Sequence, residues 1–187
     1  MTEQVIIAGF GGQGVMSMGQ LLAYAGMLEG RNVSWLPSYG PEMRGGTANC
    51  NVILSDDAVA SPIVTQATAV IALNKPSLDK FENSVMPGGL LFINSSLIDR
   101  KARRDDIEVC YIPANKIADE LGNAKVANSV MLGAYLAKAE GSVSPESIIK
   151  ALKEVLGPSK ANLIPINEEA LKRGAEAVRA GKQILQN

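Results

Sequence analysis

The stretch Val5-Ile6-Ile7-Ala8-Gly9-Phe10-Gly11-Gly12-Gln13-Gly14-Val15 decides the fold of this 187-residue chain. Its apolar half predicts a buried strand, and its glycines, at G-x-G-x-x-G spacing, predict a tight turn. Over residues 15–28 apolar side chains recur every three to four positions, which predicts a helix ending near Gly30. The start of such a helix directs unpaired backbone N–H groups and a positive dipole end at whatever lies over the turn. The chain is therefore organised around one glycine-rich corner.

The glycine spacing alone does not establish a dinucleotide site. Residues 32–36 predict a second strand, so that strand, helix and strand form a β-α-β unit. A dinucleotide-binding unit usually places an Asp or Glu at the end of this second strand to hold the ribose hydroxyls. Here Ser34 and Trp35 stand in that region, and no carboxylate is near. Binding of NAD or FAD is therefore disfavoured.

A second glycine-rich loop follows, Pro37-Ser38-Tyr39-Gly40-Pro41-Glu42-Met43-Arg44-Gly45-Gly46-Thr47. It is short for a parallel crossover, which favours an antiparallel strand at residues 49–54. In one interpretation it is an irregular turn in which Arg44 pairs with Glu42 in water. In the other it binds an anion or a partner beside the first corner, with Arg44 as the charged donor and Gly45 and Gly46 presenting backbone N–H groups.

The remaining chain alternates strands and helices. Further strands are predicted at 69–74, 90–94 and 108–112, a turn at Pro87-Gly88-Gly89, and helices at 61–67, 76–85, 114–121, from 125, from 145 and from 167 to about 184. We expect a single α/β domain over residues 1–187, with a Rossmann-like open sheet and helices on both faces in three layers. The sheet is expected to be mostly parallel, and a mixed sheet stays open.

The helix beginning near Lys125 is apolar nearly all round and is expected to be buried between other elements. Lys125, Asn128 and Ser129 share one face of its first turn. The favoured interpretation is that these polar groups cap neighbouring backbone. The alternative is that they line a site or a subunit contact at the helix start.

Composition excludes several classes of function. The net charge of −1 argues against nucleic acid as the main partner, and the basic run Arg100–Arg104 is interpreted as a solvated connection. Histidine is absent, which removes the commonest general base and metal ligand. Cys50 and Cys110 are expected to be reduced and buried, too far apart in sequence for an iron–sulfur or zinc site of this chain alone. With no signal peptide and no membrane span expected, a cytoplasmic location is predicted.

The two glycine-rich loops and the run Lys125-Val126-Ala127-Asn128, in this order, resemble the gamma subunit of the 2-oxoacid:ferredoxin oxidoreductases. The likeness covers essentially the whole chain. The form of the second loop is most similar to the 2-oxoglutarate and ketoisovalerate branch, and the indolepyruvate oxidoreductases use a similar domain. The resemblance does not fix which 2-oxoacid is used.

This resemblance implies a chain that is not catalytic alone. Such complexes oxidatively decarboxylate a 2-oxoacid on thiamine diphosphate with Mg, pass electrons through iron–sulfur clusters to ferredoxin, and form an acyl-coenzyme A. Those cofactors belong to the alpha, beta and delta partner subunits or to fused domains, and none is expected on this chain alone. No catalytic and no metal-ligating residue is assigned.

The expected role is to complete the assembly and to present an anion-binding surface near the coenzyme A or substrate entrance. The expected binding residues are those of the three motifs: Gly9, Gly11, Gly12, Gln13, Gly14, Tyr39, Glu42, Arg44, Gly45, Gly46, Lys125 and Asn128. Two alternatives remain, a free-standing nucleotide-binding oxidoreductase and a scaffold protein. In isolation, surfaces meant for partners favour formation of a homodimer.

Overall fold

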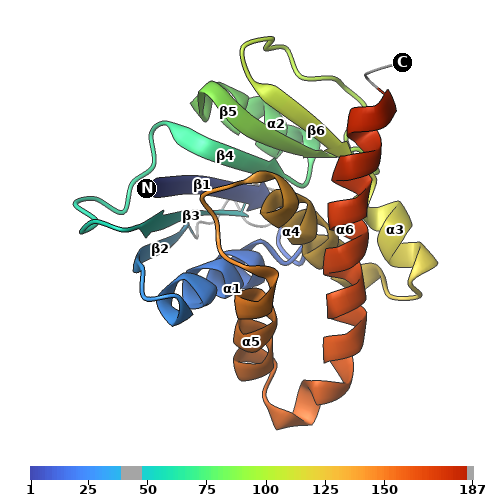
Figure 1. The fold of residues 1–187 in the computed structure, drawn as a ribbon. Helices are drawn as coiled ribbons and strands as arrows, with labels where there is room; N and C mark the ends of the chain where they lie inside the picture. Colours follow the sequence, from blue (N-terminus) through green and yellow to red (C-terminus); the bar gives the residue numbers. More distant parts are fainter. Residues whose placement is uncertain (39–47, 185–187) are drawn as a thin grey trace.

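A computed structural model describes residues 1–38 and 48–184 of the chain. The described residues form one six-stranded sheet in the order β2-β3-β1-β4-β5-β6 (Figure 1). The strands are β1 (Thr2–Gly9), β2 (Asn32–Ser38), β3 (Ala48–Ser55), β4 (Ala67–Ala72), β5 (Val85–Asn94) and β6 (Glu108–Ile112). All six lie where the sequence predicts a strand. Only β3 runs against the others, so the sheet is mixed and mostly parallel.

Strand β1 is the central element of the sheet. Val5 and Ile7 face one hydrophobic core while Ile6 faces the other, and all three are at most 2% exposed. A strand covered on both faces needs apolar residues at every position rather than in alternation, which explains the continuous apolar run before Gly9.

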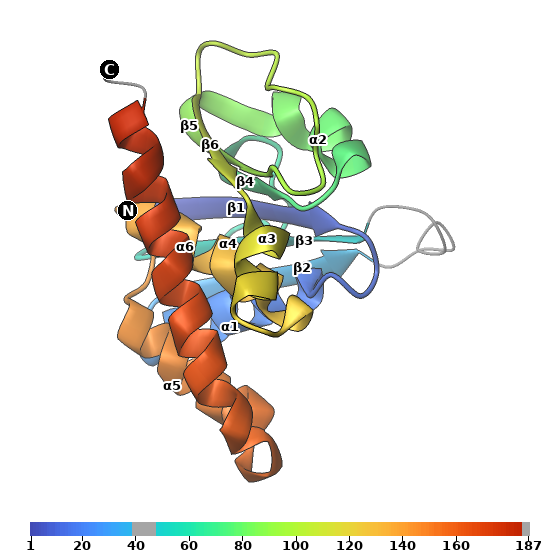
Figure 2. The same ribbon diagram turned by 90° about the vertical axis from the view of Figure 1, so that its right-hand side faces the viewer.

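Helices cover both faces of the sheet, very unequally. The helices are α1 (Val15–Leu28), α2 (Lys75–Phe81), α3 (Ala114–Glu120), α4 (Ala127–Lys138), α5 (Pro145–Leu156) and α6 (Ile164–Ile184), with short 3-10 turns η2 (Glu82–Ser84), η3 (Ala124–Val126) and η4 (Pro158–Leu163). The larger core lies under α1, α3, α4, α5 and α6, and the smaller core lies under α2 (Figures 1 and 2). The expected three layers are confirmed. Among the described residues, no helix combines the length and hydrophobicity that crossing a bilayer requires.

Helix α4 is buried between the sheet and α6, as its apolar sequence predicts. The two helices touch along their backbones, because a Cβ atom added at Gly174 of α6 would lie 1.9 Å from the Val130 carbonyl oxygen of α4. Helix α6 is amphipathic as expected, but it begins at Ile164 rather than at Asn167. The Asn167 side chain, instead of opening the helix, donates to the Leu163 carbonyl oxygen at 2.8 Å.

Three local predictions are wrong. Residues 61–67 form no helix: the segment is irregular up to Ala67, which begins β4, and Ile63 is 61% exposed while Val64 is buried. The stretch Pro87-Gly88-Gly89 is not a separate turn, because it lies inside β5, where the register against β4 shifts. Helix α2 ends at Phe81 rather than near Val85, because η2 tightens the chain before β5 begins.

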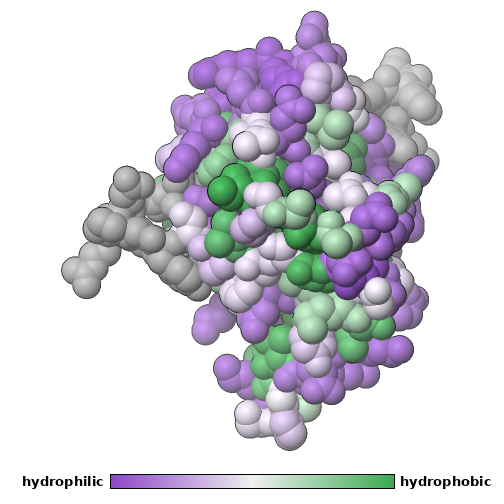
Figure 3. Space-filling view, turned by 90° about the vertical axis from the view of Figure 1, so that its left-hand side faces the viewer, coloured by the Kyte–Doolittle hydropathy of each residue, from purple (hydrophilic) through white to green (hydrophobic). Residues whose placement is uncertain are grey.

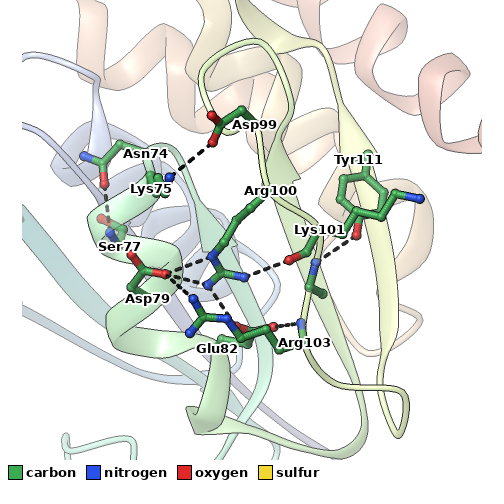
Figure 4. A network of polar contacts seen from close by, with 11 residues as sticks. Asn74, Lys75, Ser77, Asp79, Glu82, Asp99, Arg100, Lys101, Arg103 and Tyr111 are labelled. Atoms are coloured by element: carbon green, nitrogen blue, oxygen red, sulfur yellow. Dashed lines mark hydrogen bonds and ion pairs between the residues drawn. The ribbon is translucent and has the colours of Figure 1, made fainter.

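The basic run Arg100–Arg104 is not the solvated connection that the sequence suggested. The Arg100 guanidinium pairs with Asp79 at 2.8 Å and with the buried Glu82 carboxylate at 2.9 Å (Figure 4). Arg104 donates to the Val85 carbonyl oxygen and pairs with Asp106. Arg100 and Arg104 are 14% and 18% exposed; Arg100 ties the segment between β5 and β6 to α2, and Arg104 ties it to the start of β5. Arg103 is the exposed member, at 73%.

The β-α-β unit is present with one change: β3 hydrogen-bonds between β1 and β2. From β1 the chain crosses through α1 on one face towards β2, whereas from β4 it crosses through α2 on the other face towards β5. The connections therefore diverge between β1 and β4. In open α/β sheets a crevice forms at the carboxyl ends of the strands at this point, and ligands bind there.

Candidate functional site

The glycine corner joins the end of β1 to the start of α1 at this crevice. Gly14 caps α1 with φ of +78°, which favours glycine, and it offers no side-chain capping bond. A Cβ at Gly14 would also lie 2.4 Å from the Asn128 amide nitrogen of α4. Gly14 is therefore required both by its backbone conformation and by the close approach of α4.

Gln13 holds the corner in shape. Its backbone N–H donates to the Phe10 carbonyl oxygen at 3.2 Å, and its side-chain Oε1 accepts from the Phe10 N–H at 2.6 Å. The same Oε1 accepts from the Asn74 Nδ2 at 3.4 Å, which links the corner to the end of β4. The side chain also packs against Gly9, because a Cβ there would lie 2.7 Å from Oε1.

Lys125 and Asn128 meet the glycine corner although they lie more than a hundred residues away in sequence. The Asn128 Nδ2 donates to the Gly14 carbonyl oxygen at 3.5 Å. Gly12, Gln13, Lys125 and Asn128 line one cavity of about 120 Å³. Asn128 therefore fits both interpretations of the sequence, because its side chain hydrogen-bonds neighbouring backbone and also lines a cavity. Ser129 does not line this cavity, and its hydroxyl donates a hydrogen bond to the Asn167 Oδ1 at 2.6 Å.

The sequence reasoning missed two further carboxamides that line the cavity. Asn94, at the end of β5, is 1% exposed and donates to the Asn115 Oδ1 at 2.8 Å. The rest of the lining is formed by Leu73, Ala124 and Ala127. A signal was present for Asn94, because it ends a buried apolar strand and the ends of neighbouring parallel strands meet at one edge, whereas Asn115 in α3 has no such signal.

The α4 start and Lys125 give the cavity a positive field, and the α1 start adds one at the neighbouring hollow. Neither α1 nor α4 has an acidic residue in its first turn, and neither has a side-chain hydrogen bond at its N-cap. No carboxylate therefore compensates their positive dipole ends, although the Asn128 Oδ1 accepts from the Ser129 N–H at 2.9 Å in the first turn of α4. Within the described part of the chain, the Lys125 ammonium group forms no ion pair. Carboxamides around such a point can donate hydrogen bonds to an anion without adding negative charge.

The second loop lies mostly outside the described residues. Tyr39, Glu42, Arg44, Gly45 and Gly46 fall there, so their part in the site stays a prediction. The flanking strands end beside the corner, since Ala48 pairs with Gly9 and Ser38 pairs with Asn49. A second hollow of about 310 Å³ borders the outer side of the corner and includes Gly11, Gly12, Gly14 and Ala48.

The arrangement does not suit a dinucleotide. In a dinucleotide-binding sheet the second strand lies next to the first, and its terminal carboxylate reaches the ribose. Here β3 occupies that place, and no Asp or Glu occurs in β2. Both observations count against a free-standing nucleotide-binding oxidoreductase.

The donor set does not suit the metal cofactors of redox chemistry either. Cys50 is buried, and burial raises the pKa of its thiol to about 12, while the Sγ donates to the Val15 carbonyl oxygen at 3.7 Å. Cys110 is half-buried on β6, at the far side of the sheet. Among the described residues no three His, Cys, Asp or Glu side chains come together as a metal site.

Comparison with known proteins supports the resemblance seen in the sequence. Residues 4–177 match the family model described as pyruvate ferredoxin/flavodoxin oxidoreductase. Over 94% of its own length, this chain is 42% identical to the ketoisovalerate oxidoreductase subunit VorA of Methanothermobacter thermautotrophicus. The matched part is only 36% of the length of VorA. It is 32% identical to the 2-oxoglutarate synthase subunit KorC of Methanocaldococcus jannaschii, over 90% of this chain and 92% of KorC.

A solved structure agrees with these sequence relatives. The gamma subunit of a keto/oxoacid ferredoxin oxidoreductase from Geobacter sulfurreducens superposes with a TM-score of 0.80 at 30% identity, covering 95% of this chain and 99% of that one. The predicted likeness to the 2-oxoglutarate and ketoisovalerate branch is confirmed by the two relatives. The chain belongs to the pyruvate ferredoxin/flavodoxin oxidoreductase family and is of the gamma-subunit type.

Proposed function

We propose that this chain is the gamma subunit of a cytoplasmic, thiamine-dependent 2-oxoacid:ferredoxin oxidoreductase and is inactive alone. It forms one domain and assembles with alpha, beta and delta partners, which hold thiamine diphosphate, Mg and the iron–sulfur clusters. Its relatives VorA and KorC are named for ketoisovalerate and 2-oxoglutarate, which makes these two 2-oxoacids the first substrates to test. The absence of histidine and the separation of the two cysteines agree with chemistry located on partner chains.

Within that assembly, the crevice between β1 and β4 binds an anionic group of the substrate or of coenzyme A. The observation that carries this proposal is the convergence of the glycine corner, the α4 start and Lys125 on one small cavity. About 120 Å³ is room for a carboxylate or a phosphate group rather than for a whole cofactor. Gln13 and Asn128 supply neutral donors at its wall, and Arg44 is proposed as a second charge from the neighbouring loop.

The test compares two lysines on the same edge of the sheet in the assembled enzyme. Lys125 lines the cavity, whereas Lys116 of α3 is exposed outside it. Loss of one charge-assisted hydrogen bond is worth about 1.5 kcal/mol, roughly tenfold in affinity. We expect Lys125→Ala to weaken binding of coenzyme A or of the 2-oxoacid by about this factor in a calorimetric titration, and Lys116→Ala to leave both unchanged.

Unchanged affinity for both ligands in Lys125→Ala would contradict the anion site. Arg44→Ala is the companion variant, and if both cations face one anion its effect and that of Lys125→Ala should be coupled rather than simply additive in the double variant. An equal loss in Lys116→Ala would instead indicate a general electrostatic effect of the edge.

A further inference from the structure

Strand β2 is an edge strand of the sheet, and among the described strands it pairs only with β3. It is seven residues long and contains no charged residue. The edge strand on the other side, β6, is five residues long and begins with Glu108, which pairs with Lys138 of α4. Proteins protect edge strands by shortness, charge or proline, because an open edge pairs with further strands. On β2 only Pro37, near its end, gives such protection.

The direction of the β2 backbone follows from the antiparallel hydrogen-bond pattern. The Asp56 N–H donates to the Met1 carbonyl oxygen, so every second residue of β3, counted back from Asp56, points towards β1. The residues between them point towards β2 and meet every second residue from Asn32 to Ser38. The residues of β2 whose backbone points away from the sheet are therefore the other three: Val33, Trp35 and Pro37.

The unpaired part of this edge is short and has definite limits. Pro37 has no N–H, and the Arg31 N–H, just before the strand, donates to the Gly26 carbonyl oxygen at 3.0 Å. Within residues 1–38 and 48–184, the N–H groups of Val33 and Trp35 have no hydrogen-bond partner. The edge therefore offers the N–H and C=O groups of these two residues as one short, unpaired ladder.

Such a ladder selects its occupant more closely than an apolar surface does. Hydrophobic residues also gather in the middle of the side of the molecule shown in Figure 3. Those side chains set neither the direction nor the register of a partner. The N–H and C=O groups of a strand edge set both, because they bond only to a strand with matching groups.

We propose that the free edge of β2 pairs with the same edge of a second copy of this chain, antiparallel, about a twofold axis at Ser34. Val33 of each copy then lies opposite Trp35 of the other, and every N–H and C=O group of these residues is bonded. An axis at Trp35 would instead set Pro37 against Val33 and leave the Val33 carbonyl oxygen without a donor. A longer strand of another protein would lose the same bond on reaching Pro37.

The side chains near the axis suit this pairing. Val33 and Trp35 both pack against the larger core, so they share one face of β2. A β-branched residue opposite an aromatic residue is a favourable cross-strand pair, and the twofold axis makes this pair twice. Ser34 meets Ser34 of the second copy on the other face, and neither side chain is charged.

The charges at the start of β2 stay apart in this arrangement. Arg31 pairs with Asp56, which also pairs with the Met1 ammonium group. Arg31 lies three residues before Ser34, so the antiparallel orientation separates the two copies of this cluster by about 20 Å along the strands. Screening at physiological salt acts over about 8 Å, so the clusters do not repel each other appreciably.

The first test measures self-association of the isolated full-length chain by sedimentation equilibrium, from about 1 μM to 1 mM protein. We expect the wild type to dimerise, and Ser34→Lys to raise the dissociation constant at least tenfold, because two lysines then meet at the axis. Ser38→Lys is the matched control, since it adds the same charge to the same face of β2 away from the axis, and it should leave the constant within twofold. Thermal midpoints establish that both variants are folded.

Cysteine cross-linking tests the register. Ser34 and its copy form a pair without backbone hydrogen bonds, whose Cα atoms lie about 4.5 Å apart, within reach of a disulfide. We expect oxidised glutathione to cross-link Ser34→Cys into a covalent dimer, and Ser38→Cys to stay at the background of the wild type, which contains Cys50 and Cys110.

Three results would overturn the proposal. A wild type that stays monomeric throughout the concentration range shows that β2 does not recruit a second copy. A dimer that Ser34→Lys leaves unchanged uses another surface. Equal cross-linking of Ser34→Cys and Ser38→Cys excludes the twofold axis at Ser34. All three measurements use the chain alone, so they do not depend on the proposed subunit function.

Discussion

At the residue scale, the site depends on side chains that fix backbone rather than on groups that react. Gln13 satisfies the Phe10 N–H, Asn128 donates to Gly14, and Asn94 joins the end of β5 to Asn115. Carboxamides suit this work because each both donates and accepts without carrying charge. The cavity is therefore shaped before any ligand arrives, and none of the described residues that line it is an Asp or a Glu.

Gly14→Ala is expected to destabilise the protein more than Gly12→Ala. Both glycines have positive φ, at +78° and +87°, so each substitution costs about 1–2 kcal/mol of backbone strain. Only at Gly14 would the new Cβ also meet Asn128, since nothing lies within 4 Å of a Cβ at Gly12. Urea denaturation of both variants measures the difference. Equal losses would show that Asn128 moves away freely.

At the scale of elements, the pair α4 and α6 holds the larger core together. Close approach of their backbones at Gly133 and Gly174 leaves no room for side chains between them. This contact aligns the buried helix α4, so that its first turn reaches the glycine corner. The position of Lys125 and Asn128 therefore depends on a packing contact more than a full turn away.

Gly174→Ala is expected to lower the free energy of unfolding by about 1–3 kcal/mol or more, because the methyl group forces α4 and α6 apart. Gly181→Ala in the same helix is the control. Nothing lies within 4 Å of a Cβ there, so this variant should be neutral or up to about 1 kcal/mol more stable through helix propensity. The thermal midpoints of the two variants test this contrast. A harmless Gly174→Ala would mean that the helices are less tightly packed than described.

At the scale of the whole molecule, the two edges of the sheet have opposite character. The carboxyl edge gathers the glycine corner, the α4 start and Lys125, whereas exposed apolar side chains such as Met1 and Met86 lie at the amino ends of β1 and β5. This separation follows from the crossovers, because each parallel strand ends at one edge and the helix after it returns the chain to the other.

Stability should fall at alkaline pH through the buried thiol of Cys50. Burial raises its pKa from about 9 to about 12, so the folded state keeps the proton that the unfolded state releases. The stabilisation is complete below pH 9 and is lost as the pH rises from 9 towards 12, by up to about 1.4 kcal/mol per pH unit.

The measurement is the free energy of unfolding between pH 8 and pH 10 for the wild type, Cys50→Ala and Cys110→Ala. The wild type and Cys110→Ala should lose stability more steeply than Cys50→Ala over this interval. The window ends at pH 10 because the buried Tyr135, whose pKa is raised from 10 by burial, contributes above it. Parallel curves for all three proteins would contradict a protonated, buried thiol.

The sequence by itself determined the elements and the glycine corner. Local patterns were sufficient for the six strands, for α1 and for the buried character of α4, because apolar periodicity depends on which faces are covered. The corner could be recognised because the G-x-G-x-x-G spacing and the helix that follows it are local. The motif resemblance identified the family for the same reason.

Only the tertiary structure decided what those elements build. Three features depend on contacts between segments far apart in sequence. Strand β3 lies beside β1, Gln13 and Lys125 line the same cavity, and Asn94 forms a hydrogen bond with Asn115. Segment 61–67 and the run Arg100–Arg104 were misjudged for a related reason. An exposed loop and a half-buried ion pair can have similar local composition, and only the neighbouring elements determine which charges and apolar groups are covered.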